Sequence, residues 1–304
     1  MDTVEKLGHT AHALRENPDY TVSDWCFRAV RLSSEGLPLF DTHSMRLLAC
    51  LVLSILAASG SAATPHAAKE AHASADPKHW TYEGGTGPGY WADMDPANAL
   101  CRSGQQQSPI DISVTYGQKL EPLSLRYLPG LISTVNNGHT IQHNIEPGSF
   151  LEIGGDRYQL LQFHFHSPSE EAVAGRRYPM VAHFVHKNDA GQLAVIAVFL
   201  KEGKEDQRLI RSLWKKLPAA NETTRDEHLM LNPQALMPGN LAYWTLMGSL
   251  TTPPCSEGVR WLILKTPITL SARQLAQFRK IYPMNARPIQ PLHQRAILDA
   301  QGSW

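Results

Sequence analysis

Two histidines separated by a single residue, His164 and His166, constrain most strongly what this chain can fold into. They belong to the apolar, strand-forming run 162–166. Side chains alternate along a strand, so both imidazoles must project from the same face, together with Gln162. The opposite face is predicted to carry Leu161, Phe163 and Phe165. The run therefore predicts a strand that is buried on one face and offers two metal-binding groups on the other.

A third histidine lies in the next strand-forming run, residues 180–186, after a turn-prone segment. In an extended conformation His183 shares a face with Val181 and Val185. Three neutral imidazoles with an open fourth position are typical of catalytic zinc, whereas structural zinc prefers four closed ligands rich in cysteine. We therefore predict a Zn²⁺ site formed by His164, His166 and His183. The alternative is a set of surface-strand histidines that bind no metal.

The charge balance argues against a large charged partner. The chain of 304 residues has 28 lysines and arginines and 28 aspartates and glutamates, so its formal net charge is zero. Nucleic acids and acidic membrane surfaces are bound through an excess of basic charge. We therefore expect a small neutral substrate and no nucleic acid.

The N-terminal quarter has the composition of a targeting segment. Met45 and Arg46 precede an apolar run, 47–58, and the small residues 61–63, which is the three-part pattern of a secretory signal peptide. The apolar run is shorter than the ~20 residues of a membrane-spanning helix, so we expect no stable membrane anchor. A buried core helix is the alternative. Residues 45–63 therefore predict a periplasmic or secreted protein, with cleavage near Ala63.

The segments on either side of this signal peptide look unlike a folded domain. A signal peptide acts at the start of a chain, so residues 1–44 are predicted to be an upstream segment outside the true protein, with Met45 as the initiator. A genuine cytosolic extension ahead of a signal anchor is the alternative. Residues 64–78 are rich in alanine and histidine and contain two prolines, which predicts a flexible linker.

Cys101 and Cys255 are the two cysteines that follow the predicted signal peptide. An even pair in an exported protein predicts a disulfide bond. The bridge would tie down the segment that ends in Pro253 and Pro254. Two free thiols remain the alternative.

Short apolar runs bounded by Gly, Pro and Asn dominate the chain after residue 110 and predict strands. The predicted strands are 123–128, 140–145, 150–153, 158–166, 181–186, 193–200 and 259–264. Two helices are predicted, 206–217 from its apolar spacing and 271–282 from a capping box formed by Ser271 and Gln274. No internal repeat and no second domain is evident, so residues 79–304 are predicted to form one domain.

Whole motifs in this region resemble those of the α-class carbonic anhydrases. The matching runs are His79-Trp80-Thr81-Tyr82, 106–111 (QQSPID), 136–139 (NNGH), 162–166 (QFHFH), 169–170 (SE), 183–186 (HFVH), 249–254 (SLTTPP) and 285–291. The resemblance implies a mostly β (α+β) single domain with a large, mainly antiparallel twisted central sheet and peripheral helices. For the assembly we expect a monomer or homodimer.

The resemblance further implies an activity, the zinc-dependent reversible hydration of carbon dioxide to bicarbonate and a proton. In this family a zinc-bound hydroxide attacks the substrate. Carbonic anhydrase is itself the reference case for the His₃ site and for a zinc-bound water with a pKa near 7, so neither is an independent prediction.

The family pattern assigns roles to other residues of this chain. Thr251 and Glu170 match the pair that orients the hydroxide, and His139 matches the proton shuttle, whose ordinary pKa near 6.5 suits transfer in both directions. Carbon dioxide is uncharged and needs an apolar wall. The residues that match the wall and the polar side of the substrate site are Val185, Val195, Leu250, Trp261 and Thr252, with Gln162 completing the polar side and supporting His164.

Two positions depart from the family pattern. Val181 stands where a carboxylate partner of His183 is expected, so we expect looser zinc binding unless another group replaces that acceptor. Leu246 and Met247 replace a tyrosine-containing pair, and this departure is expected to affect the packing near Trp244 and Trp261. Two other functions remain open, a catalytically weak carbonic-anhydrase-like binding protein and a zinc esterase with a larger site.

Overall fold

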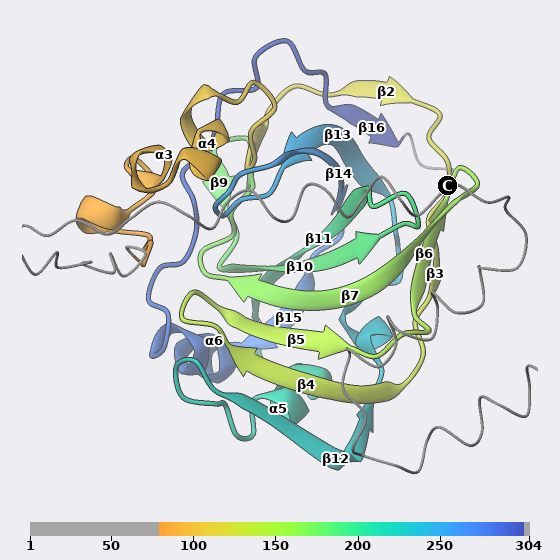
Figure 1. Ribbon diagram of the computed structural model, residues 1–304. Helices are drawn as coiled ribbons and strands as arrows, with labels where there is room; N and C mark the ends of the chain where they lie inside the picture. Colours follow the sequence, from red (N-terminus) through yellow and green to blue (C-terminus); the bar gives the residue numbers. More distant parts are fainter. Residues whose placement is uncertain (1–78, 301–304) are drawn as a thin grey trace, which may run out of the picture. The chain divides into compact units, whose positions relative to one another are not determined.

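The computed structural model describes residues 79–300 (Figure 1). The predicted upstream segment, signal peptide and linker, residues 1–78, lie outside this range. Among the described helices none has both the length and the apolar character that crossing a membrane requires.

Strands dominate the described residues, and thirteen of them form one sheet. These are β2 (Tyr116–Gln118), β3 (Ser124–Arg126), β4 (Gly130–Asn136), β5 (Ile141–Ile145), β6 (Phe150–Ile153), β7 (Asp156–His166), β10 (Met180–Lys187), β11 (Leu193–Gly203), β12 (Thr223–Leu231), β13 (Tyr243–Ser249), β14 (Glu257–Leu264), β15 (Ile268–Ser271) and β16 (Leu298–Ala300). A small second sheet contains β1 (Asp111–Ile112), β8 (Ala172–Val173) and β9 (Arg176–Arg177).

The main path of the large sheet runs β12-β4-β5-β7-β10-β11-β14-β13-β16-β2, so β7 and β10 lie side by side near its centre (Figure 1). Most neighbours are antiparallel, and the parallel pairs in this sheet are β11 with β14, β11 with β15, and β16 with β2. The predicted fold class, a large and mainly antiparallel sheet with few helices, is confirmed.

The helices are short and lie around the sheet. They are α3 (Trp91–Met94), α4 (Leu100–Ser103), α5 (Arg208–Leu213) and α6 (Ala272–Arg279), with 3-10 turns at Gly84–Thr86, Pro96–Asn98 and Pro233–Leu236. Helix α6 begins with the predicted capping box, in which the Ser271 hydroxyl accepts from Gln274 N and the Gln274 side chain accepts from Ser271 N. Helix α5 is shorter than the predicted 206–217 because Trp214 already closes it as the C-cap.

Strand β7 buries one face and presents the other to the candidate site. Phe163 and Phe165 are fully buried in the main apolar cluster, as predicted. The prediction for Leu161 is wrong, because this residue is 37% exposed. The pairing with β10 passes from Gln162 directly to Leu160, so Leu161 is an extra residue in a β-bulge and leaves the regular alternation.

The predicted Cys101–Cys255 disulfide is present and joins positions 154 residues apart. Both cysteines are buried and pack with Trp91. The bridge attaches helix α4 to the segment after β13, whose backbone is also held by a hydrogen bond from Cys255 N to Thr252 O (2.8 Å). It therefore fixes the end of the segment that carries Thr251.

Replacing both cysteines by serine is expected to lower the free energy of unfolding by about 2–4 kcal/mol, because the bridge restricts the unfolded chain. Denaturant unfolding of the double variant and the wild type measures this difference. Alkylation of both wild-type thiols without prior reduction would show that the bridge does not form.

Candidate functional site

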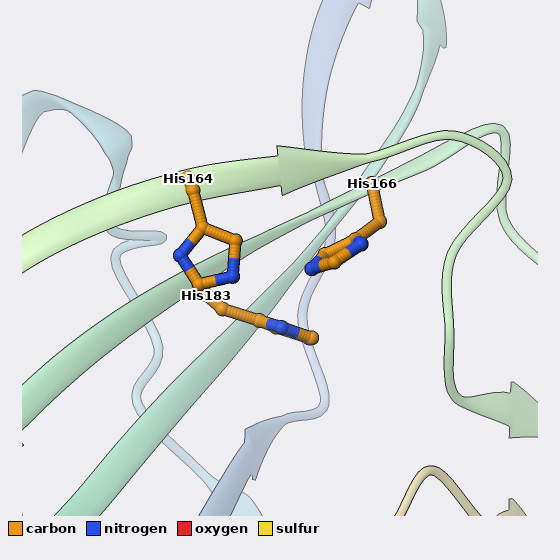
Figure 2. A group of neighbouring side chains, drawn as sticks. All are labelled: His164, His166 and His183. Atoms are coloured by element: carbon orange, nitrogen blue, oxygen red, sulfur yellow. The ribbon is translucent and has the colours of Figure 1, made fainter. Parts of the chain in front are cut away.

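Three histidine side chains converge from two neighbouring strands (Figure 2). His164 and His166 extend from β7 and His183 from β10, and the antiparallel register places His183 directly opposite His164. One ring nitrogen of each lies within 4.8 Å of the others. The structure thus brings together the three predicted metal ligands.

Hydrogen bonds on the outer side of two rings decide which nitrogen faces the centre. His164 Nδ1 lies 2.8 Å from Gln162 Oε1, and His166 Nδ1 lies 2.6 Å from Asn285 O. Both partners only accept, so each neutral ring carries its proton on Nδ1. Nε2 of each ring is left with a lone pair for a metal.

The third ring has the opposite arrangement. His183 Nε2 lies 3.3 Å from Oε2 and 3.2 Å from Oε1 of Glu171, which leaves Nδ1 toward the centre. Val181 offers no acceptor, and Glu171 is the other group that the sequence left open as its replacement. The acceptor comes from a different segment, just before β8, which the alternation along β10 could not reveal.

Burial sets the protonation state of the first two rings. Burial, together with the neighbouring His183 and His143, lowers the pKa of His164 to about 3. Burial and the other two imidazoles likewise hold the pKa of His166 well below its usual range. For His183 burial also acts to lower the pKa, but the carboxylates of Glu171 and Glu170 outweigh it and the pKa is raised. At neutral pH His164 and His166 are neutral, which is the form that binds metals.

Buried polar atoms without partners fit a cation at this centre. Within the described residues, His166 Nε2 and Glu170 Oε2 are buried and accept or donate no hydrogen bond. Glu170 Oε2 lies 3.5 Å from His166 Nε2 and 3.8 Å from His183 Nδ1. Such orphaned groups are costly unless a further ligand satisfies them. Three imidazole nitrogens form the donor set of catalytic zinc, so these residues suit Zn²⁺.

Glu170 lies fully buried beside the three rings. Its Oε1 accepts a hydrogen bond from Arg287 N (2.8 Å). Burial raises the pKa of Glu170 to about 7 and Glu171 adds to the rise, while His183, a hydrogen bond from Thr251 and the bond from Arg287 oppose it. Thr251, which the motifs pair with Glu170, lines the cavity together with the three histidines.

A cavity of about 260 Å³ opens above the three histidines. The predicted residues that line it are His139, Gln162, His164, His166, His183, Val185, Val195, Leu250, Thr251, Thr252 and Trp261. One wall is apolar and includes Trp261, whose ring lies 4.9 Å from that of His183. Five further lining residues were not predicted: Trp80, Tyr82, Asn137, Thr140 and Gln142. Three of these, Trp80, Tyr82 and Asn137, lie within matched motifs, which was the available signal.

His139 lies in the turn between β4 and β5, where Asn137 Oδ1 accepts from His139 N (3.0 Å) and Thr140 N (2.9 Å). Its ring stacks on Trp80 with centroids 3.4 Å apart and on His79 at 4.5 Å. Gly138 suits this turn, because its φ of +84° is a conformation that residues with a side chain rarely adopt. Burial and the neighbouring His79 lower the pKa of His139 to about 4, below the value of 6.5 expected from sequence.

The chain also matches known proteins. The family model described as eukaryotic-type carbonic anhydrase matches residues 86–301. A carbonic anhydrase of Pectobacterium carotovorum is 43% identical over 224 residues, which are 73% of this chain and 91% of that protein.

Two solved structures are similar in both fold and sequence. The α-carbonic anhydrase of Thermovibrio ammonificans, in complex with the inhibitor sulfanilamide, has a TM-score of 0.70 and 40% identity over 73% of this chain and 99% of that one. The Photobacterium profundum α-carbonic anhydrase has a TM-score of 0.70 and 42% identity over 73% of this chain and all of that one. This chain therefore belongs to the α-class, or eukaryotic-type, carbonic anhydrases.

Proposed function

We propose that the protein hydrates carbon dioxide reversibly to bicarbonate and a proton, with one Zn²⁺ held by His164 Nε2, His166 Nε2 and His183 Nδ1. Membership of the family supports the reaction. The observation that carries the proposal is the set of three imidazole nitrogens within 4.8 Å of one another at a small cavity. When bound, zinc acts as a Lewis acid that lowers the pKa of water to about 7, the reference value for this family, and so supplies a nucleophile at neutral pH.

Thr251 and Glu170 would orient the attacking oxygen. An ionised carboxylate can only accept hydrogen bonds, and a hydroxyl has a single proton to donate. If Thr251 donates that proton to Glu170, its own oxygen can only accept. The nucleophile must then turn its hydrogen toward Thr251 and a lone pair toward the substrate.

The cavity suits a small uncharged substrate. Val185, Val195, Leu250 and Trp261 provide an apolar wall beside the histidines, and this wall offers no charged clamp. The cavity has a volume of about 260 Å³. A comparison of turnover between carbon dioxide and an activated ester separates this function from that of a zinc esterase. The presence of all three histidines favours an enzyme over a metal-free binding protein.

His139 would carry the released proton away from the centre. In its stacked position its pKa of about 4 makes it a weak base. We propose that the ring leaves Trp80 and His79 during turnover, because exposure to water restores the usual basicity of an imidazole.

Export to the periplasm or the exterior remains part of the proposal. The disulfide supports it, because such bonds persist in oxidising compartments. The predicted signal peptide, 45–63, is the sequence feature behind it, and a monomer or homodimer is the proposed assembly.

The purified protein is expected to contain one zinc per chain and to hydrate carbon dioxide. Anions and sulfonamides that take the fourth coordination position should inhibit it. His164→Ala is expected to lose both metal and activity, because two imidazoles hold zinc poorly. Metal analysis and a hydration assay of the two proteins provide the test, and a fully active metal-free protein would refute the proposal.

His139→Ala is expected to lower turnover in weak buffer, since proton release is then slow, and added imidazole should largely restore it. Rates of carbon dioxide hydration at low and high buffer concentrations measure this effect. An unchanged rate at low buffer would remove His139 from the mechanism.

His79→Ala is expected to raise the pKa of His139 from about 4 toward 6.5. Burial is the larger cause of the shift and the neighbouring imidazole the smaller one, so removal of His79 takes away a stacked ring and a like charge. The NMR pH titration of the His139 ring, assigned with His139→Ala, measures the change. His228→Ala, which alters an exposed residue of β12, is the control. An equal or lower pKa in His79→Ala would contradict the expectation.

A further inference from the structure

We infer that Glu171 is the positioning residue of the metal centre for His183, fixing the ring proton on Nε2 so that Nδ1 faces the metal. The inference rests on the proposed zinc site. The family places a carboxylate partner for this histidine on β10, where this chain has Val181. Glu171, which lies outside β10, takes that role.

The contact between the two side chains is buried on both sides. Glu171 and His183 are each 1% exposed, and both carboxylate oxygens lie within 3.3 Å of His183 Nε2. Bulk solvent therefore does not compete for this contact. A carboxylate that accepts from Nε2 stabilises the tautomer whose lone pair is on Nδ1, and it makes the ring a more basic ligand.

The backbone holds Glu171 in place from both directions. Ser169 Oγ donates to Glu171 O (2.7 Å) and accepts from Tyr178 N (2.9 Å). On the other side, Ala172 N donates to Ile110 O (3.2 Å), where β8 pairs with β1. The Glu171 backbone is thus held by hydrogen bonds on both sides, and a fixed backbone suits a side chain that orients His183.

Val181 has a different function. It is fully buried in the apolar cluster that also contains Ile112 and Phe199, and it pairs across the sheet with His166 and Phe199. Its side chain offers no acceptor. The acceptor for His183 is therefore Glu171, in the segment between β7 and β8, and Val181 packs in the core at the position where the family has a carboxylate.

The three histidines differ in the acceptor behind them. His164 has the Gln162 amide and His166 has a backbone carbonyl, and both are neutral. Only His183 has a carboxylate. Hydrogen bonds to an ionised acceptor are roughly twice as strong as neutral ones, so the loss of Glu171 should weaken metal binding more than the loss of Gln162.

The test measures zinc release from the holoenzyme to a chelator. Glu171→Ala should release zinc about 10–100-fold faster than the wild type, the range typical for the loss of such a partner. Glu171→Gln, which keeps the shape and an acceptor oxygen without the charge, should lie between the two. It also covers the case in which the alanine variant fails to fold.

Glu257→Gln is the matched control. This carboxylate of β14 accepts from Gln106 N and the Gln107 side chain and touches none of the three histidines. Zinc release from this variant should equal that of the wild type.

A second readout separates positioning from a merely structural role. The ¹⁵N NMR shifts of the zinc-loaded protein should show the His183 proton on Nε2, and its exchange with water should quicken in Glu171→Gln. Folded Glu171 variants with wild-type zinc release and wild-type exchange would overturn the inference alone. A wild type that binds no zinc would instead overturn the proposed function.

Discussion

The pairing of β7 with β10 is the constraint on which the rest of the structure depends. The register sets His183 opposite His164, while Phe184 and Phe163, also paired, enter the apolar core on the other face. The histidines therefore cannot move toward or away from one another without pulling large buried side chains out of place. A core of this kind holds the ligand nitrogens before any metal arrives, so metal binding need not pay for ordering them.

The hydrogen bonds behind the three imidazole rings then determine which ring nitrogen is free to bind a metal. Each histidine has an acceptor behind it, and the three acceptors come from three parts of the chain: β7 itself, the segment after α6, and the segment before β8. His164 and His166 are neutral at pH 7, and the acceptors behind them leave their Nε2 lone pairs toward the centre. The buried Glu170 lies against this arrangement, with Oε2 3.5 Å from His166 Nε2, and its Oε1 accepts a hydrogen bond from Arg287 N.

The sequence allowed prediction of those strands, ligands and caps whose pattern lies within a single segment. Alternation gave β7, β10 and the three ligands, and the capping box located α6. Strand β12 was missed because it is a polar, largely exposed edge strand with no buried face to produce a pattern. Glu171 was missed because its partner, His183, is twelve residues away in sequence and lies on β10. The low pKa of His139 was missed because its stacking on Trp80 depends on the geometry of a turn, which the motifs do not encode.

The bulge at Leu161 lies where β7 exchanges one neighbour for another. Up to Gln159 the strand pairs with β6, and from Gln162 it pairs with β5, while β10 follows it on the opposite edge. One extra residue at this junction lets Leu160 and Phe163 both enter the core although their positions have opposite parity. The part of β7 that pairs with β6 and the part that carries the histidines therefore alternate independently on either side of the bulge. Deleting Leu161 would remove the extra residue and leave Leu160, Gln162 and Phe163 in regular alternation. The histidines would then keep their face, and the strand would lose the local bend and extra twist that a bulge provides.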